Sequence, residues 1–197
     1  MWLVIASVVK VLHAYQQDQE EKRKQDYDGL LGALHVLYGN ISILLNFVNS
    51  DGGRLRVTMH RVVPPSISDK DAEELEQLLP YIGGEGKGAG RKFSIRSGII
   101  GKAAREKSPF AFSRQNDDHE AFIEELKSNW AYTEEDARKL KSDRKSWMAV
   151  PIFGENNAVV GVVYLDSNEK DFFNERVKEA VINSCSGVAL YINERYK

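Results

Sequence analysis

No proline interrupts the first 53 residues of this chain, and a helical period runs through the second half of that segment. Apolar residues recur there at steps of three and four: Leu30, Leu31, Leu34, Leu37, Tyr38, Ile41, Leu44, Leu45 and Val48. This spacing places them on one stripe of a helix of about five turns. Residues 49–53, Asn-Ser-Asp-Gly-Gly, have turn chemistry and are expected to end the helix. The chain is therefore predicted to begin with one long helix, or with two nearly continuous ones.

The N-terminal end is apolar and is followed by a polar stretch over residues 16–28. A helix over residues 1–15 would be roughly 22 Å long, and the hydrocarbon core of a bilayer is about 30 Å thick. The apolar run is thus too short to span a membrane, and it has neither the basic start nor the cleavage pattern of a signal peptide. Residues 1–26 are expected to be a helical extension. It is either the end of a membrane helix whose beginning is absent or a helix buried against a partner, and its charged part fits a cytoplasmic flank or a solvated helix equally well.

Short apolar runs separated by turn residues fill the rest of the chain. Strands are expected at residues 55–63, 93–95, 110–112, 147–153 and 159–166, and helices at 98–105, 117–130, 173–196 and after Thr133. Residues 75–82 fit either a short helix or a strand. This order predicts an α+β fold with a mainly antiparallel sheet. The wide apolar stripes of the first and last helices favour packing against each other and against a second copy of the chain.

Charge and cysteine content exclude several functions. Lys and Arg number 27 against 29 Asp and Glu, so the net charge is −2, without the basic excess of a dedicated nucleic-acid binder. The single cysteine, Cys185, excludes an internal disulfide, a cysteine-based zinc site and any mechanism that needs two thiols in one chain. It also fits a reducing compartment, so a cytoplasmic protein is expected, either free or tethered to the inner face of a membrane.

Three segments together resemble the GAF domain family. Residues 93–103, followed by Ser108-Pro109, are similar to the strand-turn-helix element in the middle of that family, and residues 146–152 to its fifth strand. Residues 160–167, followed by Phe172-Phe173, are similar to its sixth strand. The resemblance covers residues 27–197. It implies a six-stranded antiparallel sheet with helices on both faces, N- and C-terminal helices packed together, a small-molecule pocket, and a regulatory sensor that dimerises through its terminal helices.

The chain departs from the functional patterns known in this family. Cys185 falls deep in the closing helix, which argues against a covalently attached bilin, and the GAF-type free methionine sulfoxide reductases use several cysteines. The cyclic-nucleotide pattern is only approximated, by Asn168, Lys170, Phe172 and Glu175. No catalytic dyad or triad can be assembled from spacing. The chain is therefore expected not to be an enzyme, and its cofactor, if it has one, is unknown.

Two groups of residues are candidates for ligand binding. The start of the helix at Ser97-Gly98, with Arg96 beside it, offers backbone donors and positive charge to an anion. Four aromatic residues on nearby elements could wall a pocket for a flat molecule. The predicted ligand-binding set is Arg96, Ser97, Gly98, Trp130, Tyr132, Trp147 and Tyr164. In the simpler alternatives the charges are solvated and the aromatic rings fill the core. His119 is expected to be a surface residue at a helix start, and no metal site is expected.

Two hypotheses follow for function. In the first, the chain is a non-enzymatic regulatory domain that binds a small ligand, either anionic or nucleotide-like, and signals through its terminal helices in a homodimer. In the second, it is a degenerate GAF-fold dimerisation module without a ligand. A membrane or an output domain is a further candidate partner for residues 1–26, and nucleic acid is not. The two hypotheses are separated by whether a cavity exists between the sheet and the irregular middle of the chain.

Overall fold

The computed structural model describes residues 2–46, 54–65, 71–84, 87–140, 143–154 and 157–195. Its helices are α1 (Trp2–Leu44), α2 (Gly98–Glu106), α3 (His119–Trp130), α4 (Glu134–Arg138) and α5 (Glu175–Arg195). Its strands are β1 (Leu55–Val62), β2 (Glu74–Gln77), β3 (Lys92–Ser94), β4 (Phe110–Ser113), β5 (Ser146–Phe153) and β6 (Val159–Ser167). The undecided segment 75–82 therefore begins in a strand, because residues 75–77 belong to β2.

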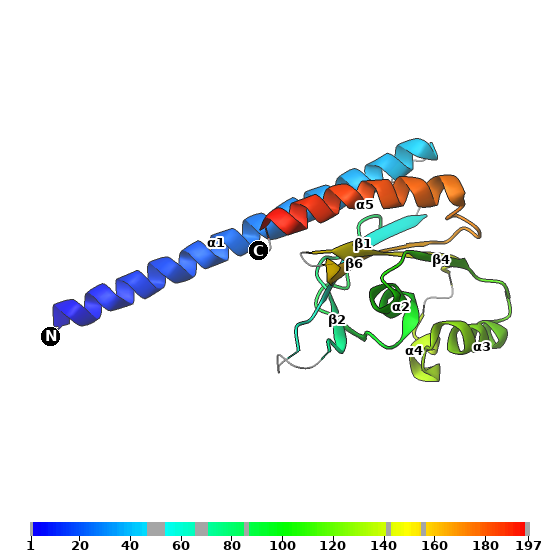
Figure 1. The fold of residues 1–197 in the computed structure, drawn as a ribbon, viewed down its shortest axis with the longest axis horizontal. Helices are drawn as coiled ribbons and strands as arrows, with labels where there is room; N and C mark the ends of the chain where they lie inside the picture. Colours follow the sequence, from blue (N-terminus) through cyan, green and yellow to red (C-terminus); the bar gives the residue numbers. More distant parts are fainter. Residues whose placement is uncertain are drawn as a thin grey trace.

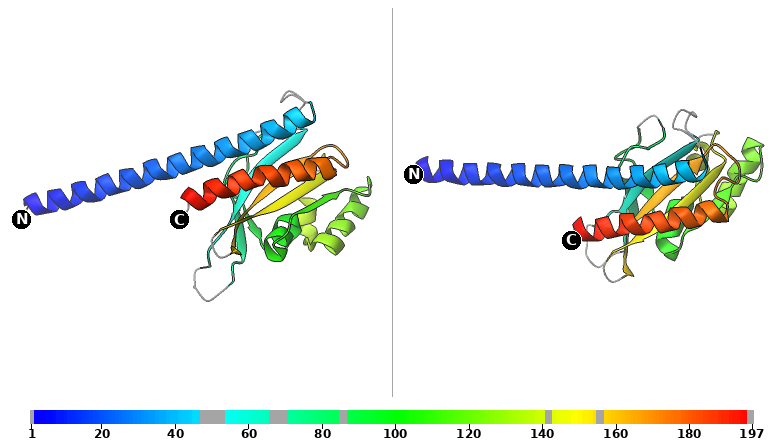
Figure 2. Two further views of the ribbon diagram at one scale, coloured as in Figure 1. Left: turned by 45° about the horizontal axis from the view of Figure 1, so that its top comes forward. Right: turned by 90° about the horizontal axis from the view of Figure 1, so that it is seen from above.

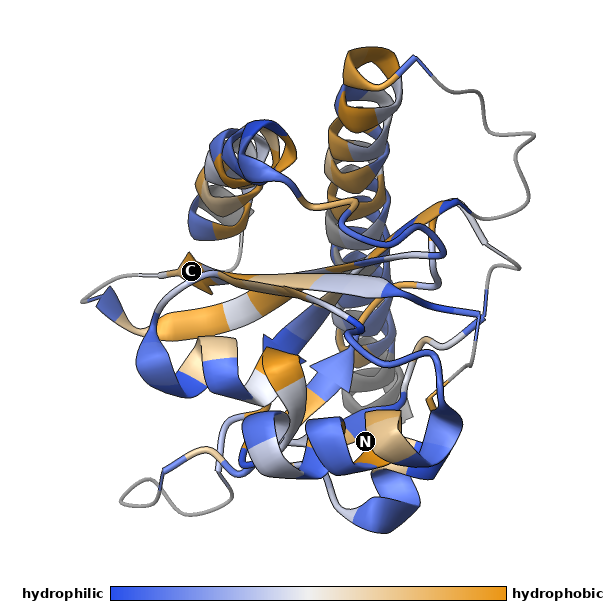
Figure 3. Ribbon diagram, turned by 90° about the vertical axis from the view of Figure 1, so that its right-hand side faces the viewer, coloured by the Kyte–Doolittle hydropathy of each residue, from blue (hydrophilic) through white to orange (hydrophobic). Residues whose placement is uncertain are grey.

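The six strands form one antiparallel sheet in the order β3-β2-β1-β6-β5-β4, which confirms the predicted α+β architecture. The central strands β1 and β6 pair from Leu55 opposite Ser167 to Arg61 opposite Gly161. Helices α1 and α5 pack together on one face of the sheet, and the short helices lie on the other (Figure 1). Figure 3 shows the same layers from the side, with α5 and the C-terminal end of α1 above the strands.

Each face of the sheet has its own apolar core, because side chains alternate along a strand. On β1, Val57 and Met59 point to the core beneath α1 and α5. On β5, Trp147 and Ala149 point to the other core, which contains α2 and α3. The antiparallel sheet is thus buried on both faces, and this one sheet lies between the two helical layers.

Helix α1 is continuous through the predicted boundary at residue 26 and projects beyond the domain (Figure 2). Its second half buries Leu30, Leu34, Leu37 and Ile41 against the domain. In its first half the described side chains between Lys10 and Asp28 are nearly all exposed. The predicted turn at residues 49–53 lies outside the described residues. None of the described helices is both long enough and apolar enough to cross a bilayer.

Candidate functional site

A cavity of about 440 Å³ lies between the sheet and the layer of short helices. Its volume falls in the range of roughly 300–1,000 Å³ that is typical of small-molecule sites. The sheet contributes Arg56, Phe93, Trp147, Tyr164 and Asp166, and α2 with its N-cap contributes Ser97, Gly98 and Ile100. Tyr81, Arg91, Tyr132, Asp136, Lys139, Leu140 and Arg144 are among the other lining residues. Arg91 and Lys92 are exposed, so the cavity opens to solvent on their side.

Two arginines and one aspartate form the charged floor of the cavity. Asp166 on β6 accepts hydrogen bonds from Arg56 on β1, from Nε at 2.7 Å and from Nη2 at 2.6 Å. The nearest nitrogen of Arg144 lies 3.6 Å from the same carboxylate, and Asp166 is almost fully buried. Burial alone would lower the pKa of Arg56, but the hydrogen bond and the charge of Asp166 outweigh it and raise that pKa above its ordinary value. Arg56 is therefore held in its charged form, and its hydrogen bonds to Asp166 link the two central strands across the floor.

Three tyrosines stand around this floor with neutral hydroxyl groups. Burial is the main cause that raises the pKa of Tyr81 to about 12, and burial also raises the pKa of Tyr132 and Tyr164. The negative charge of Asp166 raises the pKa values of Tyr81 and Tyr164 further. The guanidinium of Arg56 lies over the ring of Tyr81, 4.5 Å from its centre. The phenols can thus both donate and accept hydrogen bonds at any physiological pH.

The N-terminus of α2 opens onto the cavity. Ser97 is the N-cap residue, and its side chain makes no capping hydrogen bond. Gly98 has a φ of +72°, and a Cβ there would lie 2.7 Å from the hydroxyl of Tyr132. Both the left-handed backbone and the close approach of Tyr132 require glycine at this position. The helix start and the tyrosine are therefore fitted to each other at the cavity wall.

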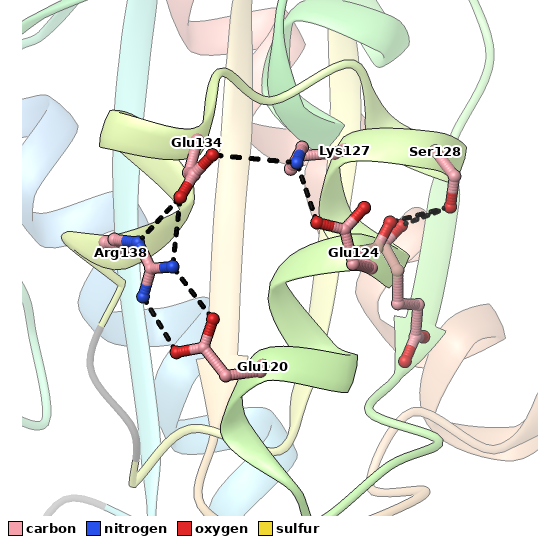
Figure 4. A network of polar contacts seen from close by, with 7 residues as sticks. Glu120, Glu124, Lys127, Ser128, Glu134 and Arg138 are labelled. Carbon is pink, nitrogen blue, oxygen red and sulfur yellow. Dashed lines mark hydrogen bonds and ion pairs between the residues drawn. The ribbon is translucent and has the colours of Figure 1, made fainter.

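Ion pairs on the surface hold α4 against α3 (Figure 4). Arg138 on α4 binds both carboxylate oxygens of Glu120 on α3 at 2.8 Å, and it also contacts Glu134 at 3.0 Å. Lys127 on α3 reaches Glu134 at 3.7 Å. Such exposed pairs each contribute little to stability, but together they fix where α4 lies. Since Asp136 on α4 lines the cavity, and Lys139 and Leu140 follow it, the network positions one wall of the site.

Most of the predicted ligand-binding residues meet at the cavity: Ser97, Gly98, Tyr132, Trp147 and Tyr164. Arg96 does not, because its side chain is 79% exposed and points toward Glu73, 3.7 Å away. Trp130 does not line the cavity either. It stacks on Phe112 at 4.3 Å, with the Lys102 ammonium 5.0 Å from its ring centre.

Trp147 serves both the cavity and the core. It lines the cavity, but it is almost fully buried and its ring stacks between Phe112 at 4.6 Å and Phe122 at 5.4 Å. The predicted alternative of core filling therefore also holds for this residue. A substitution of Trp147 would change the cavity and the stability of the domain together.

The predicted ligand-binding set did not contain Arg56, Tyr81, Arg91, Arg144 and Asp166. Two of them had a recognisable signal. Arg56 is a charge between two apolar strand residues, and Asp166 follows the apolar run 159–165 directly. A charge in a strand that is buried on both faces needs a partner inside the protein, and only the β1–β6 register identifies it, with Arg56 opposite Asp166.

Neither Cys185 nor His119 belongs to the cavity lining. Cys185 is buried in the core beneath α1 and α5, on the other face of the sheet, where burial raises the pKa of its thiol to about 12. His119 begins α3, whose N-cap is Asp118. Within the described part of the chain, no group of three or more His, Cys, Asp or Glu side chains is arranged to hold a metal ion.

Comparisons with known proteins give matches in structure only. No protein-family model and no curated protein matches the sequence. The GAF domain from an Acinetobacter phosphoenolpyruvate-protein phosphotransferase matches with a TM-score of 0.51 and 10% identity, over 79% of this chain and 77% of that chain. A type II free methionine-R-sulfoxide reductase from Thermoplasma acidophilum matches with a TM-score of 0.50 and 14% identity, over 82% of this chain and 95% of that chain.

The second of these structures corrects one expectation from the sequence. The chain was expected not to be an enzyme, and this is contradicted because a protein of the same fold is a methionine sulfoxide reductase. The lack of a catalytic dyad in the sequence is thus no ground for excluding catalysis. The first structure confirms the resemblance on which the fold was predicted. This chain has the GAF fold.

Proposed function

We propose that this chain is a regulatory domain that binds a small, flat molecule in its cavity and transmits the binding to α1 and α5. The observation that carries the proposal is the cavity itself, which combines aromatic walls with a charged floor. A module that served dimerisation alone would have no reason to keep an ionised cluster such as Arg56 and Asp166 beside an open space, since buried charges are costly.

The strand order offers a direct route for the signal. The cavity floor stands on β1 and β6, the two central strands. Helix α1 precedes β1 and α5 follows β6 in the chain, and the two helices pack together on the far face. A ligand that shifts Arg56 or Asp166 therefore acts on the two strands that are joined to these helices. A coupled displacement of α1 against α5 is the expected response.

We propose further that the signal leaves through a homodimer formed by these helices. Val36 and Ile43 on α1 are 64% and 81% exposed, and Leu190 on α5 is 67% exposed. Leu12 and Tyr15 add exposed apolar surface on the projecting half of α1. Packing against a second copy would cover these residues. A membrane or an output protein that engages residues 1–26 is the alternative partner.

A pair of neighbouring substitutions tests ligand binding. Ser97→Trp places a large ring in the cavity, whereas Arg96→Trp places the same ring one residue away on the surface. Ser97 has an extended backbone, with φ −124° and ψ 156°, which tryptophan adopts without strain. Thermal shift and calorimetry with cyclic nucleotides, nucleoside monophosphates and aromatic acids are expected to find a binder. Ser97→Trp should abolish that binding and Arg96→Trp should retain it.

Two results would overturn the proposal. If no compound binds the unaltered protein at millimolar concentration, the cavity is not a ligand site, and the dimerisation module without a ligand becomes the better description. If Ser97→Trp, shown by circular dichroism to be folded, binds as tightly as the Arg96→Trp control, the compound binds elsewhere.

Light scattering after size-exclusion chromatography tests the homodimer. Ile43→Glu places a charge on the exposed apolar face of α1 and is expected to give a monomer. Glu21→Gln, on an exposed position of the same helix, is the control and should stay dimeric. A monomeric unaltered protein, or an Ile43→Glu variant that is still a dimer, would contradict this assembly.

A further inference from the structure

Three arginines from separate segments line the cavity together with Tyr81. Arg56 lies on β1, Arg91 precedes β3, and Arg144 precedes β5. All three line the cavity with Tyr81, and the positive charge of each acts on its phenol. Residues so far apart in sequence meet here because the strand order places β1 between β2 and β6, with β5 next to β6.

The cavity lining carries less negative charge than positive charge. Asp166 is the only buried carboxylate among the described lining residues, and it faces both Arg56 and Arg144. Asp136, the other described carboxylate of the lining, is already bound by Thr133 and Lys139, the residues that flank its own helix. For Arg91, no described carboxylate lies within ion-pair distance. Arg144 is also paired with Asp143 at 3.0 Å, so two carboxylates, Asp166 and Asp143, face the three guanidinium groups of the lining.

The two lysines of the rim have surface partners, and so does Arg144, whose guanidinium lies 3.0 Å from the carboxylate of Asp143. Lys92 is paired with Glu74 at 2.8 Å, and Lys139 with Glu135 at 2.8 Å. By contrast, Arg56 gives only one edge of its planar group to Asp166. Guanidinium groups bind carboxylate and phosphate through two parallel hydrogen bonds, which a lysine ammonium cannot reproduce.

We infer that the ligand carries an anionic group, a carboxylate or a phosphate, which binds among Arg56, Arg91 and Arg144 next to the hydroxyl of Tyr81. The neutral phenol can donate a hydrogen bond to this group. The rest of the molecule then occupies the apolar part of the cavity, formed by Ile100, Leu140 and Trp147. This inference rests on the proposed function and adds the chemical class of the ligand.

Pairs of compounds that differ only in the anionic group test the inference. Adenosine 5′-monophosphate with adenosine is the phosphate pair, and indole-3-acetate with indole-3-ethanol is the carboxylate pair. Calorimetry is carried out on the full chain, on Arg91→Gln and on Arg96→Gln. Both variants remove one exposed positive charge from neighbouring segments, but only Arg91 lines the cavity. Both are surface substitutions and are expected to fold.

In at least one pair the anion is expected to bind about tenfold or more tightly than its neutral partner. The pair that shows the preference identifies the group as phosphate or carboxylate. Arg91→Gln should weaken binding of the anion about tenfold and leave the neutral compound unchanged, and Arg96→Gln should change neither. Higher salt should weaken the anion alone.

Equal binding of anion and neutral partner would overturn the inference while the proposed function stands. An equal loss in Arg91→Gln and Arg96→Gln would also overturn it, because the effect would then be one of overall charge. All four compounds could fail to bind while another, uncharged molecule binds and Ser97→Trp abolishes its binding. That result would refute the anionic group of the ligand but would leave the cavity as the ligand site. Failure of every compound would contradict both.

Discussion

Asp166→Asn is expected to destabilise the domain strongly, because it removes the one carboxylate that faces two buried guanidinium groups. The side chains of Asp166, Arg144 and Arg56 are 1%, 7% and 12% exposed, so water reaches none of them well. The two hydrogen bonds from Arg56 are short, at 2.6 and 2.7 Å. Removing one partner of a buried ion pair costs about 3–5 kcal/mol, mainly because the remaining charge is left buried. For a domain of this size that cost corresponds to a fall in melting temperature of roughly 6–20 °C.

The same strand offers a matched control. Arg61 on β1 also binds a carboxylate on the neighbouring strand through Nε and Nη2, at 2.9 and 2.6 Å, but this pair with Glu76 is exposed. Glu76→Gln should therefore cost only about 0–1 kcal/mol. The assay is urea unfolding of both variants, followed by circular dichroism. Equal losses for Asp166→Asn and Glu76→Gln would refute the reasoning, because burial would then not decide the energy of the pair.

Three further substitutions test the fold around the site. Leu34→Ala in the core under α5 should cost about 2–5 kcal/mol in urea unfolding, whereas Val36→Ala, two residues along the same helix and 64% exposed, should change stability by about 0.5 kcal/mol or less. Burial lowers the pKa of His60 to about 3. Below pH 6.5 this histidine is therefore protonated in the unfolded chain but stays neutral in the folded domain. Stability should consequently fall by about 1.4 kcal/mol per pH unit between pH 6 and 4, and His60→Gln should lack this part of the slope; identical slopes would contradict it. Gly98→Ala should lower the melting temperature, since both the φ of +72° and the nearby Tyr132 hydroxyl oppose a Cβ at this position. Gly32→Ala, a control in α1 with open space around it, should raise stability by about 0.5–1 kcal/mol. A stabilising Gly98→Ala would refute the close fit at the cavity wall.

Local sequence patterns were sufficient to predict most of the secondary structure, because helices and strands each repeat their side-chain directions over a few residues. The period of three and four in α1 and the alternation along β1 are set by side-chain geometry within one element, so they can be read without a partner. The N-cap at Thr133 was likewise predicted, since the residue and the amide that it accepts from, at Asp136, are three residues apart. The local pattern of residues 75–82, by contrast, could not distinguish a helix from a strand. β2 has only four residues, and its strand state depends on pairing with β1 and β3.

The candidate site followed the same division. Ser97 and Gly98 were identified from the sequence because a helix start is a local feature, and Trp147 and Tyr164 because they are aromatic residues in strands. Arg96 and Trp130 were expected to join them, but the direction in which a side chain points depends on its neighbours in space. Arg96 turns outward to Glu73, and Trp130 is occupied by its stack on Phe112.

By itself, the sequence determined the α+β class, the long first helix and the resemblance to GAF domains, since these depend on periodicity and on short runs of neighbouring residues. Only the tertiary structure decided that Arg56, Arg91 and Arg144 line one cavity together with Asp166. These residues come from different segments, and the register of β1 against β6 sets which of them face one another. Charges interact more strongly when they are buried than when they are exposed to solvent. Which charged residues are buried depends on the packing of distant segments, and the sequence does not specify this residue by residue.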